Sequence, residues 1–309
     1  MGTCRSAVGY AVGVALGIGL MPVTAALGDD QAAWIKLAVI LALFSGIGLF
    51  CAWRGSKEIY HEEGAAAEEE RNLPLLKGIG ILFRNKYWIV MTIFGVCMNI
   101  MYAMVLTSGV YYAQAVVGDM NFYSTINTVN LIPSVIGFLT VGALIKRIGL
   151  TKTARLASVI GIVGSVIRLM APANALCYLI GGSIVMYATI PLISVMPAMV
   201  LNTSEANVKL GGARMTGMTN AGNSFVGKIG SGLGGSLIGW ILAAGGYDKF
   251  AAGGELTAGV TNSVYLLNFW VPLAMFIIMF VFLVRYDLED KLPAMIEENN
   301  RYLAEKYQA

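Results

Sequence analysis

Residues Ser263–Val284 read SVYLLNFWVPLAMFIIMFVFLV, a run of 22 residues without one charged side chain. A transmembrane helix needs about 20 consecutive, mostly apolar residues, so this run is long enough to cross a bilayer. It is too long for a barrel strand, and it lacks the alternation of apolar and polar residues that such strands show. It therefore predicts one membrane-spanning helix.

Seven further runs of the same kind precede it. They are Ala7–Leu27, Ala33–Trp53, Trp88–Ala113, Ile126–Ile145, Leu156–Ala171, Leu176–Leu201 and Met218–Ala244. Of the 309 residues 57% are hydrophobic and 13% charged, whereas soluble domains are about 25% charged. The first run is longer than the apolar region of a signal peptide, and seven further spans follow it, so we interpret it as a membrane span. We expect an all-α integral membrane protein with about eight transmembrane helices.

Lysine and arginine residues fall almost entirely on one side of these spans. Seventeen of the 21 lie there: Arg5, Arg54, Lys57, Arg71, Lys77, Arg84, Lys86, Lys146, Arg147, Lys152, Arg155, Lys209, Arg214, Arg285, Lys291, Arg301 and Lys306. The opposite side has Lys36 and Lys249. Because basic loops stay in the cytoplasm, we expect a multi-pass protein of the cell membrane with both termini cytoplasmic.

The acidic residues and the histidine exclude several function classes. All 18 acidic residues lie outside the predicted spans, and the single histidine, His61, lies in a charged loop. Since the spans thus offer no His, Asp or Glu as acid, base or ligand, we expect no enzyme, no metal site and no cofactor. The basic residues are dispersed along the chain, which argues against nucleic acid as a partner.

Two basic residues fall inside predicted spans. Arg168 is near the outer end of its span, from which a long side chain can snorkel to water. Lys228 is well inside the seventh span, where an uncompensated charge costs at least about 2.5–3.5 kcal/mol. We expect Lys228 to face a wet cavity or a carboxylate; the alternative is a lysine that snorkels toward the cytoplasm.

A polar stripe accompanies Lys228. Ser224 and Asn220 precede it by one and two helical turns, so the three share one helix face. Such a stripe offers donors and acceptors to a sugar, which presents many hydroxyl groups in one place. Further polar residues of the third and fourth spans are Asn99, Tyr102, Thr107, Ser108, Thr125, Asn127, Thr128 and Asn130. For these, lining a cavity and bonding between helices remain open alternatives.

The spans are unevenly spaced along the chain. Two lie in residues 1–53, a charged stretch covers residues 54–87, six lie in residues 88–284, and residues 285–309 form a polar tail. Major facilitator carriers consist of two six-helix halves joined by a cytoplasmic loop. We therefore interpret residues 1–53 as the last two helices of an N-terminal half, 54–87 as the central loop, 88–284 as the C-terminal half and 285–309 as a cytoplasmic tail.

Three short stretches match a known pattern: GALIKRIG at 142–149, GARMTG at 212–217 followed by Lys228 and Gly245-Gly246-Tyr247, and the tail from Tyr286 to Glu297. With the helix pattern, they resemble the glycoside–pentoside–hexuronide cation symporters, which include the melibiose and glucuronide carriers. The resemblance implies that this chain corresponds to helices five to twelve of such a major facilitator carrier and lacks the first four.

The resemblance also implies roles for single residues. Lys228 matches a lysine tied to coupling and sugar affinity, Ser224 occupies the polar position one turn before it, and Arg5 looks like an arginine that contacts sugar. An ordinary positive-inside anchor is the alternative for Arg5. The residues with implied gating roles are Arg214, Glu205, Lys146 and Arg147. The family often shows Ala-Asp-x-x-Asp-Tyr-x-Glu before the arginine, whereas here only Glu205 of residues 201–208 is acidic.

The expected function is secondary transport of a sugar (a glycoside, pentoside or hexuronide) coupled to a sodium ion or a proton. The family's cation-binding aspartates lie in helices two and four, so the resemblance places the coupling site outside this chain. Expected partners are the sugar substrate, the coupling cation, the lipid bilayer and a missing N-terminal portion of a truncated carrier. The alternative function is a non-transporting membrane sensor or scaffold derived from a carrier.

Overall fold

The computed structural model describes residues 12, 23, 26–28, 31–55, 73–211 and 213–308. The chain divides into two compact units, Met1–Ala67 and Glu68–Ala309. In the first unit the main described element is α2 (Gln31–Gly55), an apolar helix with Arg54 in its last turn. It confirms the predicted second span. The predicted first span lies almost wholly outside the described residues.

The second unit is built of helices throughout its described part. They are α4 (Leu75–Arg84), α5 (Lys86–Tyr112), η1 (Ala113–Val117), α6 (Asn121–Ile148), α7 (Leu150–Met170), α8 (Ala175–Asn202), α9 (Glu205–Gly211), α10 (Thr216–Gly245), α11 (Tyr247–Ala251), α12 (Ala258–Tyr265), η2 (Leu266–Trp270), α13 (Val271–Val284) and α14 (Leu288–Gln308). The two η segments are single turns of π-helix that continue α5 and α12. The all-α class is confirmed.

Seven helical runs in the described parts of both units are long and apolar enough to cross a membrane. They agree with the last seven predicted spans. The predicted start of the fifth span at Leu156 is wrong, because α7 begins at Leu150. Its first turns contain the charged residues Lys152 and Arg155, so the apolar run that marks the span in the sequence starts only after them. In the structure Arg155 lies along the end of α13 and donates to the Leu283 and Tyr286 carbonyl oxygens at 2.9 Å each.

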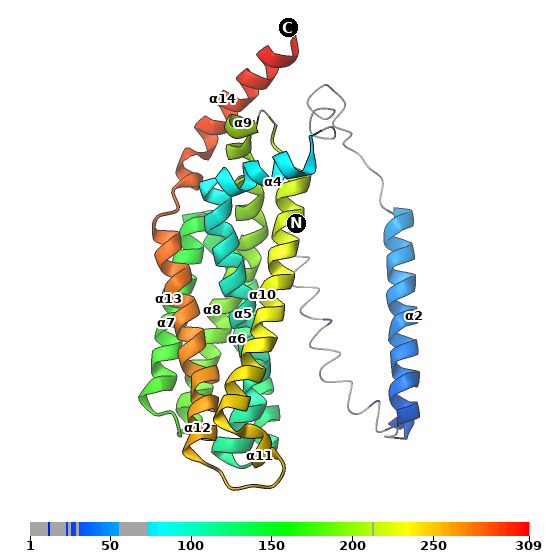
Figure 1. Cartoon of the computed structure of the whole chain (residues 1–309), viewed down its shortest axis with the longest axis vertical. Helices are drawn as coiled ribbons and strands as arrows, with labels where there is room; N and C mark the ends of the chain where they lie inside the picture. Colours follow the sequence, from blue (N-terminus) through cyan, green and yellow to red (C-terminus); the bar gives the residue numbers. More distant parts are fainter. Residues whose placement is uncertain are drawn as a thin grey trace. The chain divides into compact units, whose positions relative to one another are not determined.

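The six spans of the second unit run side by side, with α4, α9 and α14 at one end of the bundle and α11 at the other (Figure 1). The stretch interpreted as the central loop, residues 54–87, contains the short helix α4. This helix buries Gly78, Ile81 and Leu82 and exposes its remaining side chains, so it lies on the end of the bundle as an amphipathic helix.

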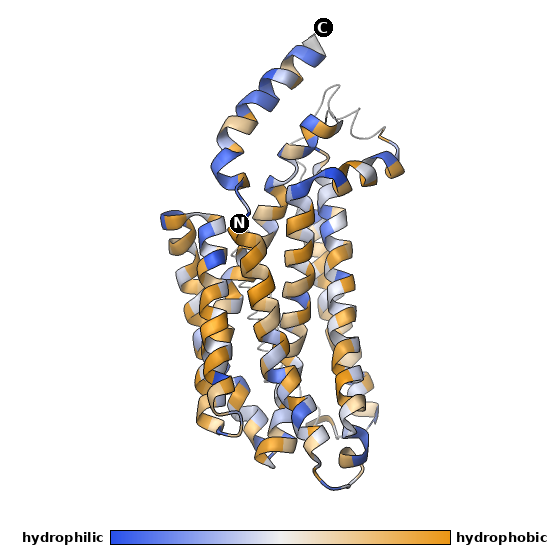
Figure 2. Cartoon of the chain, turned by 60° about the vertical axis from the view of Figure 1, so that its left-hand side comes forward, coloured by the Kyte–Doolittle hydropathy of each residue, from blue (hydrophilic) through white to orange (hydrophobic). Residues whose placement is uncertain are grey.

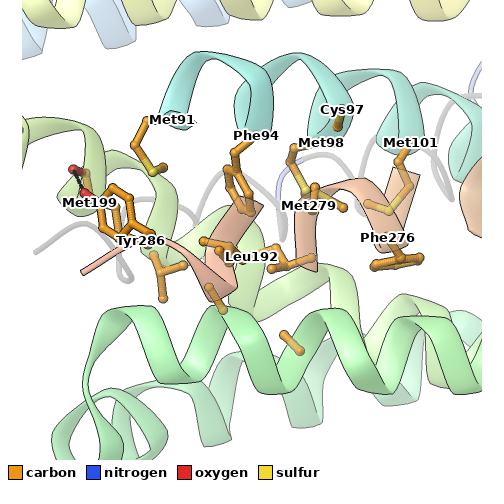
Figure 3. Close-up of a cluster of buried hydrophobic side chains, with 14 of the residues drawn as sticks. Met91, Phe94, Cys97, Met98, Met101, Leu192, Met199, Phe276, Met279 and Tyr286 are labelled. Atoms are coloured by element: carbon orange, nitrogen blue, oxygen red, sulfur yellow. Dashed lines mark hydrogen bonds between the residues drawn. The ribbon is translucent and has the colours of Figure 1, made fainter. Parts of the chain in front are cut away.

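Apolar residues cover the bundle along most of its length, whereas α14 is mostly hydrophilic (Figure 2). The largest buried cluster joins α5, α7, α8 and α13, with methionine prominent in it (Figure 3). It includes Met91, Phe94, Met98, Met101, Leu192, Met199, Phe276 and Met279. The flexible thioether side chain fills the irregular spaces between the helices, where van der Waals packing is the main attraction in a membrane.

Two glycines, Gly164 and Gly181, allow α7 and α8 to approach each other closely. A Cβ atom built on Gly181 would lie 2.6 Å from the Gly164 carbonyl oxygen and 2.5 Å from Arg168 Cγ. Any larger residue at position 181 would force the helices apart. The close approach places Arg168 of α7 directly against α8.

Candidate functional site

Helix α10 carries the predicted polar stripe of Asn220, Ser224 and Lys228, and all three residues are exposed in the second unit. The Ser224 hydroxyl donates to the Asn220 carbonyl oxygen at 3.0 Å, so its lone pairs remain able to accept a hydrogen bond. The Lys228 ammonium group forms no ion pair with a described residue. The stripe therefore presents one cation and two neutral polar groups outward from α10.

The interface between α5 and α10 brings Asn99 to this face. Asn99 Nδ2 donates to the Gly95 carbonyl oxygen at 2.8 Å, and its Oδ1 accepts from the Ser231 hydroxyl at 3.4 Å. Ser231 lies three residues after Lys228 and shares its helix face. Tyr102 lies one turn beyond Asn99 on α5 and is half-buried. Sequence reasoning missed Ser231, although its spacing from Lys228 fits the same periodicity.

Glycines allow this close contact between α5 and α10. A Cβ atom at Gly234 would lie 2.8 Å from Ala103 Cβ and 3.2 Å from Ile100 Cα, whereas one at Gly235 would meet nothing within 4 Å. Five glycines between residues 230 and 239 of α10 differ in what they face. Those at 230 and 234 pack on α5, while those at 232, 235 and 239 face open space within the described structure.

Two of the four predicted gating residues form an ion pair at the end of the bundle that carries α9 and α14. Arg214 Nε donates to Glu205 Oε1 at 2.8 Å, and Arg214 Nη2 donates to Asn300 Oδ1 at 2.6 Å. Asn299 Nδ2 donates to Glu205 Oε2 and to the Glu205 carbonyl oxygen, both at 2.9 Å. The side chains of Arg214 and Glu205 are 30% and 15% exposed, so solvent screens the pair only in part. The ion pair is therefore tied to the tail helix through two asparagines.

A buried amide pair lies beside this ion pair, and sequence reasoning missed it. Asn85 Nδ2 donates to Asn207 Oδ1 at 2.7 Å and to the Thr203 carbonyl oxygen at 2.8 Å. Asn207 Nδ2 in turn donates to the Arg214 carbonyl oxygen at 2.9 Å. Asn85 also caps α5 by accepting from two backbone N–H groups. An asparagine directly before an apolar helix is the one pattern that could have indicated it.

The other two predicted gating residues, Lys146 and Arg147, are exposed at the end of α6. No hydrogen bond or ion pair joins their side chains to the Glu205–Arg214 pair within the residues described. Next to them Glu289 caps α7 by accepting from the backbone N–H groups of Leu150 at 2.7 Å and Thr151 at 2.6 Å. The structure therefore brings two of the four gating residues together and leaves the other two apart.

The capping carboxylate of Glu289 has a shifted pKa. Burial by itself would raise this pKa, but the hydrogen bonds from Thr151 and Leu150 outweigh burial and hold it below its ordinary value of 4.5. The positive end of the α7 dipole acts in the same direction. Glu289 therefore fixes the start of the tail helix to the start of α7 as an ionised carboxylate.

The prediction that Arg168 snorkels to water is wrong. Arg168 is 5% exposed, and its Cζ atom lies 4.0 Å from the centroid of the Tyr178 ring and 5.5 Å from that of Phe269. Helix α8 covers the side chain, since a Cβ atom on Gly181 would lie only 2.5 Å from Arg168 Cγ. Arg168 is thus a buried cation against aromatic rings.

The structure does not test the predicted role of Arg5 or the expected absence of a metal site. Arg5 lies outside the described residues, so its predicted sugar contact stays a prediction. Within the described ranges no group of three or more His, Cys, Asp or Glu side chains is arranged to hold a metal ion. Ser108 resolves its two alternatives, since its hydroxyl bonds across helices to Asn268 Oδ1 at 2.9 Å.

Comparison with known proteins agrees with this architecture. Residues 1–290 match the model of a family described as MFS/sugar transport protein. A candidate sulfoquinovose importer of Salmonella typhimurium is 26% identical over 81% of this chain and 52% of its own length. The isoprimeverose transporter of Lactiplantibacillus pentosus is 25% identical over 86% of this chain and 54% of its own.

A glucuronide carrier protein homolog of Escherichia coli is also similar, at 25% identity over 85% of this chain and 56% of its own length. The chain thus spans about half the length of the curated relatives it matches. The family match extends over α2 and nearly all of the six-span bundle, including the polar face of α10 and the Glu205–Arg214 pair.

Proposed function

The chain belongs to the MFS/sugar transport protein family, and we propose that it acts in a secondary transporter that carries a sugar or glycoside across the cell membrane with a sodium ion or a proton. The relatives support the substrate class, because two of them are named for isoprimeverose and glucuronide. These two relatives are named as a transporter and a carrier, so we propose that this chain takes part in transport rather than in catalysis.

Lys228 carries this proposal. It lies in a membrane-spanning helix and, in the second unit, its side chain is exposed. A lysine at membrane depth is costly unless it reaches water or a polar ligand, and a solvated sugar site supplies both. The hydroxyl groups of a bound sugar would meet Lys228, Ser224 and Asn220 on α10, and Asn99 and Tyr102 on α5.

The coupling ion would bind carboxylates that the described spanning helices do not contain. Helices α2, α5, α6, α7, α8, α10, α12 and α13 have no Asp or Glu. Ion-coupled carriers usually hold the cation with acidic groups inside the membrane. The same fact favours the second candidate function, a membrane sensor or scaffold that binds without coupling.

The Glu205–Arg214 pair suits a gate at the cytoplasmic end. Alternating access in this superfamily moves one helical bundle against the other, so contacts at one end must break when that end opens. Basic residues of the second unit gather at the same end in α4, α9, α14 and the neighbouring connections, so this end and both chain termini are proposed to face the cytoplasm. Lys146 and Arg147 would take part when the bundle rearranges.

The experiment is uptake of labelled glycosides and uronides into vesicles under an imposed sodium or proton gradient. The full chain is tested alone and together with the first four helices of a related carrier. We expect gradient-driven uptake that Lys228→Ala abolishes. The matched control is Lys249→Ala, since Lys249 is an exposed lysine in α11 at the opposite end of the bundle. Uptake should survive that change.

Two other results would redirect the proposal. Equal uptake by the Lys228→Ala and Lys249→Ala variants would remove Lys228 from the site. No uptake by inserted, folded protein in either arrangement would favour the sensor or scaffold.

A further inference from the structure

Arg168 is a buried charge whose hydrogen-bonding capacity is incompletely used. A guanidinium group has five N–H donors and stays charged in proteins. Arg168 Nε is buried and has no hydrogen-bond partner in the part of the chain that the structure describes. The surrounding helices α5, α6, α7 and α8 contain no Asp or Glu. A charge without a counter-charge in such a site is unfavourable, and the low dielectric strengthens its attraction for an anion.

Aromatic rings hold the guanidinium in position without neutralising it. Tyr112 stacks on Tyr178 with ring centroids 3.8 Å apart and an interplanar angle of 15°. Since the Arg168 Cζ atom lies 4.0 Å from the same Tyr178 centroid, the two groups must occupy opposite faces of the ring. The Tyr178 hydroxyl donates to Asn268 Oδ1 at 2.7 Å, so its proton is directed to that amide. The Tyr178 ring is thus held by Tyr112 and Asn268, and the Arg168 guanidinium group packs against its other face.

A small cavity lies beside Arg168. Its lining comes from four helices and includes Val105, Ile126, Asn130, Arg168, Tyr178 and Gly182. Gly182 leaves open the space that a side chain would fill, and a Cβ atom there would lie 3.9 Å from Asn130 Oδ1. Arg168 brings N–H donors to this lining, and Asn130 brings a side-chain amide with both an N–H donor group and an acceptor oxygen; the other side chains are mainly apolar. The cavity combines a positive charge with donors and has no acidic group in its lining.

We propose that this cavity binds one small monovalent anion of the size of chloride, between the Arg168 guanidinium and the Asn130 side-chain amide. A chloride ion neutralises the buried charge and accepts hydrogen bonds from both groups. Space for about one water-sized group leaves no room for a sugar acid or a phosphate. Water would accept the hydrogen bonds but would leave the charge uncompensated. The bound ion would link α6 to α7, so it should stabilise the folded bundle.

The test measures thermal unfolding of the purified full chain in detergent at constant sodium concentration, in chloride, bromide or gluconate. Chloride and bromide are single-atom anions, whereas the six-carbon gluconate is far too large for the cavity. We expect both halides to raise Tm by several degrees over gluconate, with an effect that saturates as the halide concentration rises. Equilibrium binding of radioactive chloride should give one ion per chain. Arg168→Met should lose both effects, whereas the control Arg285→Met, which removes an exposed arginine, should keep them.

Asn130→Leu provides a second variant if Arg168→Met does not fold, and it should weaken chloride binding at least tenfold. Bromide anomalous scattering from crystals of the unchanged protein would locate the ion directly beside Arg168. Equal Tm values in chloride and gluconate, without retained radioactive chloride, would mean that the cavity holds water and would overturn the proposal. Chloride binding that persists in both Arg168→Met and Asn130→Leu would also overturn it, because the ion would then lie elsewhere.

Discussion

Gly234→Ala should destabilise the interface between α5 and α10, whereas Gly235→Ala should not. The added methyl group at position 234 would lie 2.8 Å from Ala103 Cβ and 3.2 Å from Ile100 Cα. Carbon atoms pack best at about 3.5–4.0 Å, and neither neighbour can move without its backbone. Overpacking of this kind costs about 1–3 kcal/mol. At position 235 the same methyl group would meet nothing within 4 Å.

The pair of variants isolates packing from helix preference. Both substitutions gain the same intrinsic helix propensity, up to about 1 kcal/mol, so this contribution cancels in the difference between them. At about 2–4 °C per kcal/mol for a domain of this size, Gly234→Ala should unfold roughly 2–12 °C below Gly235→Ala. The assay is thermal unfolding of the purified proteins in detergent, followed by tryptophan fluorescence. Equal unfolding temperatures, or a lower one for Gly235→Ala, would refute the assigned packing of α10 on α5.

Two further predictions concern the ends of the bundle. Because the pKa of Glu289 is lowered in the folded state, Glu289 stabilises the fold above its ordinary pKa of 4.5, and this stabilisation is lost as pH falls through the folded pKa. Glu289→Gln should therefore flatten the loss of Tm at acid pH. Parallel curves of Tm against pH for the two proteins would contradict this. In a double-mutant cycle of Glu205→Gln and Arg214→Gln, the half-buried ion pair should give a favourable coupling energy of about 1 kcal/mol. The coupling energy is measured by urea or thermal unfolding. Additive effects of the two single substitutions would show that the pair contributes nothing to stability.

The network around Glu205 gives the tail helix a role beyond that of a polar extension. Asn299 is 1% exposed, and it donates to both the side chain and the backbone of Glu205. Lys209 of α9 also pairs with Glu298 of α14 at 2.7 Å, although this pair is more exposed. Any rearrangement of the Glu205–Arg214 pair must therefore move or release α14. This links the amphipathic tail to the proposed gate.

The sequence by itself predicted the spans, and the structure confirms the last seven of them; their orientation stays a prediction. Apolar runs of about 20 residues predict membrane helices reliably, because the bilayer leaves no other way to satisfy the backbone N–H and C=O groups of one segment. The polar stripe of Asn220, Ser224 and Lys228 also followed from helical periodicity alone, since residues four apart share a face. The family resemblance implied gating roles for Glu205 and Arg214, and the structure shows that the two residues, nine apart in sequence, form an ion pair.

Only the tertiary structure decided which helices meet and what each polar group contacts. The place of Arg168 near the end of its span predicted that it reaches water, whereas the close approach of α7 and α8 buries it against Tyr178. The amide pair of Asn85 and Asn207 joins residues 122 positions apart, and no local pattern encodes such a contact. Helix formation depends on neighbours within one turn, so a sequence reveals it. The burial and pairing of a side chain depend on how distant segments of the chain pack together, and that packing is decided by all the side chains of the bundle at once.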